Sequence, residues 1–334
     1  MKLSPFLKTM PIRYPRPLRP GDTIAVVSPS AGVRAPMHSR LDAALQALAS
    51  RGLVVREGAL LRQQTAGASG TAAERAAELM NALLDDDVTA VIPPWGGELA
   101  IEILRLLDFD RLARVRPKWL TGFSDISTVQ LPMLLRLGWG SVHGPNLMQF
   151  PDPPHSSATA ALLDLLYARG ATTPVQRPLT SKPSTRLDGN HSPTSFSGRL
   201  LGGCLDSISR LAGTPVGDVQ AFNRRHESDG VILFIENAEL KPFEMLRALT
   251  GLRLAGWFDN ARGVLLGRNA AVLHEGECEI DEYQAVARAL DGIGCPVLLD
   301  VDIGHVGPQW SLVQGAIGTC SWEAGAATLR QELR

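Results

Sequence analysis

The sequence lacks long apolar runs, paired cysteines and an excess of charge of either sign. Its longest purely aliphatic or aromatic stretches, such as residues 231–235, are far shorter than the ~20 residues that a membrane-spanning helix needs. The formal net charge of −1 favours neither a nucleic-acid partner nor an anionic membrane surface. The 4 cysteines show no C-x-x-C spacing, so we expect free thiols in a reducing compartment.

Three further features are missing. Residues 1–20 carry basic side chains among prolines but no apolar core of the kind a secretory signal needs, which predicts a cytoplasmic protein. Neither G-x-G-x-x-G nor the phosphate-binding P-loop pattern occurs, so no nucleotide-cofactor fingerprint is present. His274, Glu275, Glu277 and Cys278 are metal-capable side chains, but they follow one another in a polar loop without ligand spacing. We therefore predict no metal site there.

What the first half does contain is an alternation of short apolar runs with helical patterns. Strands are predicted at 22–30, 53–59, 88–95 and 118–123, and helices at 39–52, 71–84, 98–107 and 125–138. This alternation predicts an α/β fold with a Rossmann-like parallel sheet. Ligands bind beyond the carboxyl ends of such strands, where the turns SPSAG, PPWGGE and GFSD lie.

Residues 171–197 are rich in Pro, Ser and Thr and have no periodicity, which is typical of a linker. Regular patterns resume after them. We therefore predict an N-terminal α/β domain over 18–170, a linker over 171–197, and a smaller β-rich α+β domain over 198–334.

Ser124 is the candidate nucleophile, because it lies where an apolar strand ends and a helix begins. Gly122 permits a tight turn there, and the N–H of Asp125 can stabilise negative charge at the start of the helix. Gly96 and Gly97 leave their amides uncovered, so the PPWGGE loop can supply a second oxyanion donor. The alternative is that Ser124 only caps the helix.

A nucleophilic serine needs a base and an acid that orients the base. His305 follows an apolar strand between two glycines and is the candidate base, with His143 as its rival. Glu236 ends the strand VILFI and is the candidate acid, with Glu239 nearby. Taken singly, a salt bridge or cap explains Glu236, and a packed loop histidine explains His305.

Six segments in order resemble the LD-carboxypeptidase family of serine peptidases, which includes muramoyltetrapeptide carboxypeptidases and microcin C immunity peptidases. They are LRPGDTIAVVSPSAG, WGGE followed by LLDFD, GFSDIS, GRLLGGCLDSISRLAGTP, LFIENAE and DIGHVGPQWSLVQGA. The likeness covers nearly all of the chain from Leu18 onward.

The resemblance implies a Ser-Glu-His triad of Ser124, Glu236 and His305 that is assembled across the cleft of two domains. It implies the amides of Asp125 and Gly97 as oxyanion donors. It also implies a homodimer that needs no metal or organic cofactor.

Two positions depart from the family. Trp95 stands where an Arg usually precedes the two glycines, which favours the microcin-immunity branch or a relative outside both named branches. Trp95, beside Gly96, and Trp310 then become candidate aromatic walls for a nucleotide-like ring; the alternative is that Trp95 is buried at the sheet edge. Cys204 stands where the family usually has Asn, and we expect it to be a small packed residue.

The sequence therefore predicts a serine carboxypeptidase or amidase. The expected substrate is a small peptide or peptidyl-nucleotide, such as a murein tetrapeptide or a microcin C-like conjugate. Two other classes stay open: a non-catalytic small-molecule binding protein on the same fold, and an esterase or acyltransferase.

Overall fold

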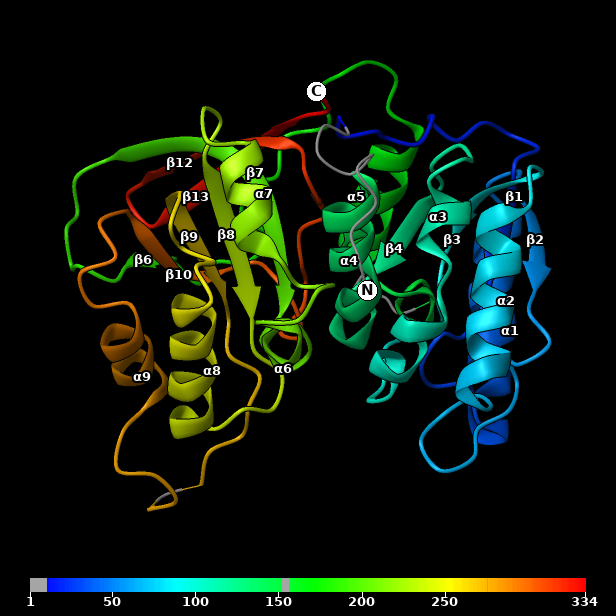
Figure 1. Cartoon of the computed structure of the whole chain (residues 1–334), viewed down its shortest axis with the longest axis horizontal. Helices are drawn as coiled ribbons and strands as arrows, with labels where there is room; N and C mark the ends of the chain where they lie inside the picture. The colour runs from blue at the N-terminus through cyan, green and yellow to red at the C-terminus, as the bar shows by residue number, and fades with distance from the viewer. Residues whose placement is uncertain (1–10, 152–155, 275) are drawn as a thin grey trace. The chain divides into compact units, whose positions relative to one another are not determined.

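The computed structural model describes residues 11–151, 156–274 and 276–334. The chain forms two compact units (Figure 1). The first unit runs to Gly170 and includes Ser311–Gln314, whereas the second comprises Ala171–Trp310 and Gly315–Arg334. The predicted fold class is confirmed, because a parallel α/β unit precedes a β-rich unit.

The described residues of the first unit form a six-stranded sheet, in which the strand that comes latest in the sequence is antiparallel to its neighbour and the other strand pairs are parallel. In spatial order its strands are β11 (Leu312–Val313), β5 (Val142–His143), β4 (Trp119–Gly122), β3 (Val88–Val91), β1 (Thr23–Val26) and β2 (Val54–Glu57). The strand order reverses between β1 and β3. In doubly wound sheets the ligand crevice lies at the carboxyl ends of the strands at this reversal.

Three of the four helices that the sequence predicts in the first unit are present as α-helices. Thr71 and Glu74 form the expected capping box, in which the Glu74 N–H donates to Thr71 Oγ1 at 3.3 Å and the Thr71 N–H donates to Glu74 Oε2 at 2.9 Å. The segment expected as a helix near 98–107 is the 3-10 helix η3 (Ala100–Leu106). The others are η2 (Ala35–Met37), α1 (His38–Ala49), α2 (Ala72–Leu84), α3 (Phe109–Leu112), η4 (Ser124–Ile126), α4 (Ser127–Leu137), η5 (Leu147–Gln149) and α5 (Ser156–Tyr167).

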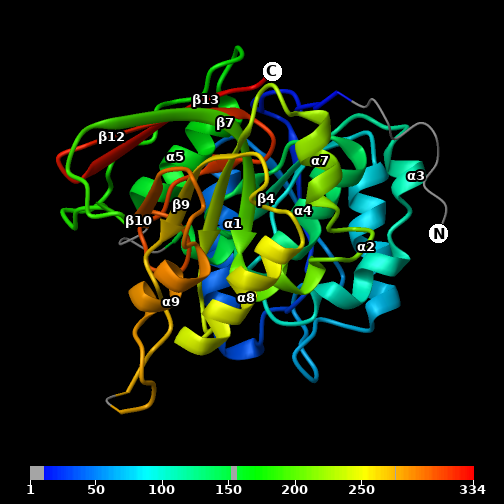
Figure 2. The same ribbon diagram turned by 60° about the vertical axis from the view of Figure 1, so that its left-hand side comes forward.

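The second unit has a seven-stranded mixed sheet with a parallel centre and antiparallel edges. Its order is β13 (Ala326–Glu332), β12 (Ile317–Glu323), β7 (Thr194–Cys204), β8 (Val231–Glu236), β9 (Ala261–Gly267), β10 (Val297–Val301) and β6 (Thr185–Arg186). Strands β7 to β10 are parallel, so their carboxyl ends share one edge. Figure 2 shows β7, β12 and β13 running together as a long curved layer.

Five helices lie in the described residues of the second unit, and α8 and α9 are side by side in both views (Figures 1 and 2). They are α6 (Leu205–Ile208), η7 (Ser209–Leu211), α7 (Val219–Arg225), α8 (Pro242–Leu254) and α9 (Glu282–Ala289). No helix in the described part of the chain is both long and apolar enough to cross a membrane.

Residues 171–197 differ from the expected linker, because they contribute to the second unit's sheet. The N–H groups of Thr173 and Gln176 donate to the carbonyl oxygens of Gln331 and Leu329 in β13. Strand β6 also lies in this segment, and β7 begins before it ends. Proline-rich chain is compatible with such positions because an edge strand leaves one row of backbone groups unpaired.

Candidate active site

The turn that carries Ser124 is strained. Ser124 follows β4 and has a φ of 63°, a left-handed conformation that non-glycine residues seldom adopt. Gly122 has a φ of 134°, and a Cβ there would lie 2.5 Å from Asn146 Oδ1, so only glycine fits. Ser124 is the first residue of η4, whose N-cap is Phe123. A serine held on a sharp strand-to-helix turn has the mechanics of a nucleophile elbow.

The Gly-Gly loop after β3 packs directly on this turn. A Cβ added to Gly96 would lie 2.8 Å from Ser124 Oγ and 2.9 Å from the Asp125 nitrogen. Gly97 has a φ of 139°, and a Cβ there would lie 2.5 Å from Ser30 Oγ. The loop backbone therefore approaches the Ser124 hydroxyl more closely than any other residue type would allow.

The side chain of Asp125 connects the three turns at this edge of the sheet. Asp125 is 4% exposed, and its Oδ2 accepts hydrogen bonds from Ser30 Oγ at 2.6 Å and from the Ala100 N–H at 2.8 Å. Its Oδ1 accepts from Thr128 Oγ1 at 3.0 Å. Burial raises the pKa of Asp125, and the three hydrogen bonds only partly offset that rise.

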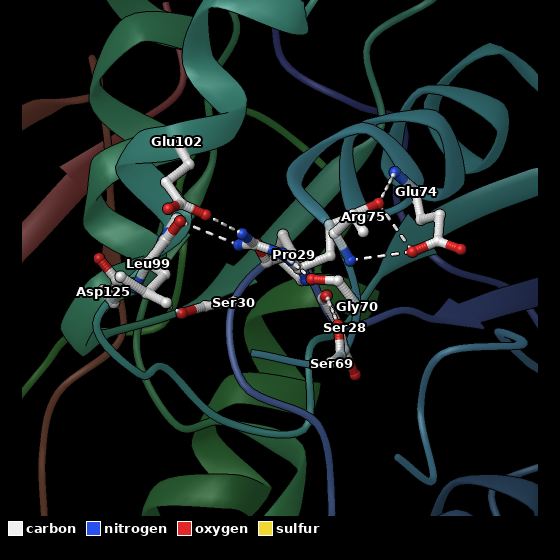
Figure 3. Close-up of polar contacts among 12 residues, drawn as sticks. Ser28, Pro29, Ser30, Ser69, Gly70, Glu74, Arg75, Leu99, Glu102 and Asp125 are labelled. Atoms are coloured by element: carbon white, nitrogen blue, oxygen red, sulfur yellow. Dashed lines mark hydrogen bonds and ion pairs between the residues drawn. The ribbon is translucent and has the colours of Figure 1, made fainter. Parts of the chain in front are cut away.

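Arg75 of α2 holds the same loops through their carbonyl groups (Figure 3). Its buried guanidinium donates to the carbonyl oxygens of Pro29 at 3.0 Å, Leu99 at 2.9 Å and Gly70 at 3.0 Å. Glu102 accepts from it at 2.5 Å, which balances the charge. Arg75 and Asp125 thus fix the SPSAG turn and the chain that follows Gly97.

In the second unit, Glu236 and His305 form a hydrogen-bonded pair. Glu236 ends β8 and is 1% exposed, and its Oε2 lies 2.7 Å from His305 Nδ1. Burial of the ring lowers the pKa of His305, but the hydrogen bond and charge of Glu236 outweigh it, so the pKa is raised overall. The ring is 25% exposed, which leaves it accessible to a reaction partner.

The loop that carries His305 is held against Glu236 by close backbone contacts. A Cβ on Gly304 would lie 2.4 Å from Glu236 Oε2, so glycine is required at this position. Arg268 pairs with Asp302 and also donates to the carbonyl oxygens of Val306 at 2.7 Å and Pro308 at 2.9 Å. These contacts orient the histidine loop from both of its ends.

Two residues near this pair were given no catalytic role from the sequence. Asp206 accepts from the N–H groups of Ala238 at 3.0 Å and Glu239 at 2.9 Å, so it fixes the chain that follows Glu236. Cys204 ends β7 and is paired in register with Glu236. As expected it is packed, being 1% exposed, with Sγ 3.4 Å from Asp206 Oδ2.

Several other candidates are anchored in ways that bear on their roles. His143 is fully buried in β5, edge-on to Phe123, so the rival base is a core residue. Trp95 is half-buried, and its Nε1 donates to the Gly32 carbonyl at 3.0 Å. The Trp310 ring is buried and donates to the Arg177 carbonyl at 2.7 Å, so it packs within the second unit rather than forming an open wall.

The polar loop at 274–278 offers no described metal cluster. The N–H of His274 donates to Glu277 at 3.1 Å, and Glu277 forms an ion pair with Lys241. Glu275 lies outside the described residues.

Comparison with known proteins decides the family. The model of the LD-carboxypeptidase N-terminal domain matches residues 24–144, and that of the C-terminal domain matches residues 197–319. The chain belongs to the LD-carboxypeptidase family. It is therefore a serine-type carboxypeptidase. The family match does not support a non-catalytic binding protein or an esterase.

Relatives within this family agree over most of their length. A protein of Streptomyces coelicolor named as a carboxypeptidase is 32% identical over 94% of this chain and 95% of its own. A Bacillus subtilis protein named a probable murein peptide carboxypeptidase is 29% identical over 90% of this chain and 89% of its own. The microcin C7 self-immunity protein MccF of Escherichia coli is 25% identical over 90% of each chain, which is consistent with a place near that branch.

The fold is also that of a solved relative. The structure of MccF in complex with glutamyl sulfamoyl guanosine superposes with a TM-score of 0.80 at 20% identity, covering 97% of this chain and 99% of that one. At this level of identity the likeness concerns the fold.

Proposed function

We propose that the chain hydrolyses an amide bond near the C-terminal end of a small peptide substrate, with Ser124 as nucleophile. The observation that carries this proposal is the strained backbone of Ser124 beneath Gly96. A left-handed non-glycine residue costs about 1–3 kcal/mol and persists mainly where function requires it. The Glu236–His305 hydrogen bond is the second support, because a catalytic serine needs an oriented base.

In the first step, Ser124 Oγ attacks the carbonyl carbon of the scissile amide while neutral His305 takes its proton. Glu236 accepts the Nδ1–H of His305, so Nε2 is the ring nitrogen that takes the proton. The N–H groups of Asp125 and Gly97 stabilise the oxyanion that forms on the substrate. His305 then gives its proton to the amine nitrogen, the C–N bond breaks, and an ester on Ser124 remains.

In the second step, water attacks the ester carbonyl and gives a proton to His305. The tetrahedral intermediate collapses, the acid product leaves, and Ser124 Oγ takes the proton back from His305. The Glu236 carboxylate stabilises the imidazolium that forms transiently in both steps. Its effect on the pKa of His305 has the sign that this role requires.

The substrate is proposed from Trp95 and from the names of the relatives. One relative is named for murein peptides, and another has been solved with glutamyl sulfamoyl guanosine. Trp95 precedes Gly96 and is only half-buried, so part of its ring can meet a ligand at the oxyanion loop. Stacking of a base on an aromatic ring contributes about 1–3 kcal/mol. We therefore favour a peptidyl-nucleotide over a murein tetrapeptide.

An active-site serine reagent tests the nucleophile, with hydrolysis of three substrates measured alongside. The panel is a D-Ala-terminated muropeptide, an aspartyl-adenylate mimic and a simple ester. The reagent should label the wild type and the matched control Ser50→Ala, an exposed serine at the end of α1, but not Ser124→Ala. Labelling or substantial hydrolysis by Ser124→Ala would make the mechanism wrong.

His305→Ala should lose hydrolysis of the same panel, whereas His191→Ala, an exposed loop histidine, should retain it. Cleavage of the ester alone would favour an esterase. Binding of the panel without labelling of Ser124 would favour a non-catalytic binding protein. The homodimer and the cytoplasmic location stay predictions.

A further inference from the structure

Cys204 lies beside the Glu236–His305 pair because of the register of the second unit's sheet. Strands β7 and β8 are parallel, and Cys204 is opposite Glu236 at their carboxyl ends. One ligand atom from each of Cys204, Glu236 and His305 lies within 4.8 Å of the other two. Among the described residues, this is the one group of three His, Cys, Asp or Glu side chains placed closely enough to share a metal ion.

We propose that Cys204, Glu236 and His305 form an inhibitory site for a thiophilic divalent cation of the zinc class. The bound ion occupies the base and its orienting acid, and so switches off hydrolysis. The inhibition rests on the proposed function, whereas the binding does not. The ion is a regulator or inhibitor here, and no step of the proposed hydrolysis uses it.

The distances suit such an ion with small adjustments. Zinc bonds of about 2.0–2.3 Å in a tetrahedral site separate the ligand atoms by about 3.3–3.8 Å. The side chains need to move inward by about 1 Å or less to reach that spacing from 4.8 Å. The Nδ1–Oε2 contact of 2.7 Å has to widen, so zinc replaces the hydrogen bond between His305 and Glu236. The partly exposed His305 ring provides the route for the ion to enter.

The charges at the site also favour a dication. Glu236 Oε1 is buried and has no hydrogen-bond partner among the described residues. This carboxylate oxygen can therefore bind a cation without losing a hydrogen bond. Asp206 Oδ2 lies 3.4 Å from the Cys204 sulfur, which adds a second carboxylate. Burial and then the charges of Glu236 and Asp206 raise the pKa of the Cys204 thiol well above its usual range. A dication offsets the same crowding of negative charge.

Binding replaces the S–H bond of Cys204 with an S–Zn bond, and the thiol proton passes to solvent. Neutral His305 gives its nitrogen lone pair to the ion, and one oxygen of Glu236 becomes the third ligand, with water as the fourth. With Nδ1 on zinc, Glu236 no longer orients the ring. The ring proton that Nδ1 held now lies on Nε2, which has no lone pair left to accept a proton from Ser124, so base catalysis stops.

The test adds Co2+ to the chelator-treated full-length chain, because cobalt substitutes for zinc and a Co–thiolate bond absorbs in the near ultraviolet. One equivalent should produce this absorption, and one equivalent of Zn2+ should remove it. Cys204→Asn, which installs the residue usual in the family, should abolish it. Cys320→Ser is the matched control, since Cys320 is also buried in the second unit and should leave the absorption unchanged.

Hydrolysis is then measured against Zn2+ concentration, each variant relative to its own zinc-free rate. The wild type and Cys320→Ser should be inhibited and recover with chelator. Cys204→Asn should need at least about tenfold more Zn2+, because losing a ligand weakens a site by that order. Absence of the thiolate absorption in the wild type, or its persistence in Cys204→Asn, would overturn the proposal. If no substrate is cleaved but the Cys204-dependent absorption is present, the proposed function fails and the metal site stands.

Discussion

Two substitutions of the buried Asp125 separate the effect of its hydrogen bonds to the loops from the effect of its negative charge. Asp125→Ala removes the acceptor of the Ala100 N–H and of the Ser30 hydroxyl. Asp125→Asn is isosteric: its amide oxygen can accept from Ala100 and Ser30, while its NH2 group donates to Thr128, whose hydroxyl rotates. The first variant frees the loops, and the second only removes the charge.

The expected stabilities follow from burial and hydrogen bonding. A buried donor left unsatisfied costs about 1–3 kcal/mol, so Asp125→Ala should lower the free energy of unfolding by that amount. In the wild type, the raised pKa of Asp125 means that the folded state binds this proton more tightly than the unfolded state. Asp125 therefore stabilises the folded state while it is protonated. This stabilisation is complete below the unfolded pKa of about 3.9 and is lost as the pH rises through the folded pKa. Asp125→Asn avoids that loss and should be as stable as the wild type, or more stable, at neutral pH.

The expected activities differ in the same way. If Asp125 positions the amides of the oxyanion hole, Asp125→Ala should lower kcat by about 10²–10³-fold, the usual effect of losing one oxyanion donor. Asp125→Asn should stay within about tenfold of wild type. Urea unfolding gives the stabilities, and steady-state hydrolysis of the adenylate mimic gives kcat and KM. Wild-type kcat and stability in Asp125→Ala would refute the positioning role, and equal damage by both variants would mean that the charge itself is required.

Three further predictions concern the nucleophile, the base and the substrate. Gly96→Ala places a Cβ against Ser124 and should lower kcat by about 10²-fold or more while urea unfolding reports a folded chain; unchanged kcat would argue against a tight oxyanion loop. Because the pKa of His305 is raised, kcat/KM should rise with pH through that pKa, and Glu236→Gln should lower kcat by about 10²–10⁴-fold and move the acid limb to lower pH. An unmoved limb would separate Glu236 from the titrating base. Trp95→Ala should weaken kcat/KM for the adenylate mimic by roughly ten- to a hundredfold and barely change it for the muropeptide, whereas equal losses would mean that Trp95 shapes the loop.

The parts of the site that the sequence could predict are those encoded over short stretches. GFSD places Ser124 after an apolar strand, and VILFI ends on Glu236, so local patterning finds both. The left-handed backbone of Ser124 is accommodated by Gly122 and Gly96, which leave space around the turn, and both glycines can be read from the sequence. Similar local signals gave β8 and the start of α2.

Contacts between distant segments could not be predicted in this way. The sequence indicates a role for the backbone N–H of Asp125, but the side chain accepts hydrogen bonds from Ser30 and Ala100, which lie 95 and 25 residues away. A carboxylate after a serine gives no local sign that it will be buried. The Pro, Ser and Thr content of 171–197 likewise predicts a linker, because the partners of this segment in β13 come at the far end of the chain and leave no local signal.

Each unit uses buried charge for the same physical purpose. In the first unit Arg75 collects carbonyl oxygens from three loops, and in the second Arg268 does so along the histidine loop. Burying such a charge costs free energy unless it is paired and hydrogen-bonded, so it is a poor way to obtain stability alone. Its advantage is directional: a planar guanidinium fixes several carbonyl groups at once, as an apolar side chain of the same size cannot. Loops held in this way can keep a strained serine or a glycine-bordered histidine in one geometry, which catalysis requires and loop sequences by themselves do not provide.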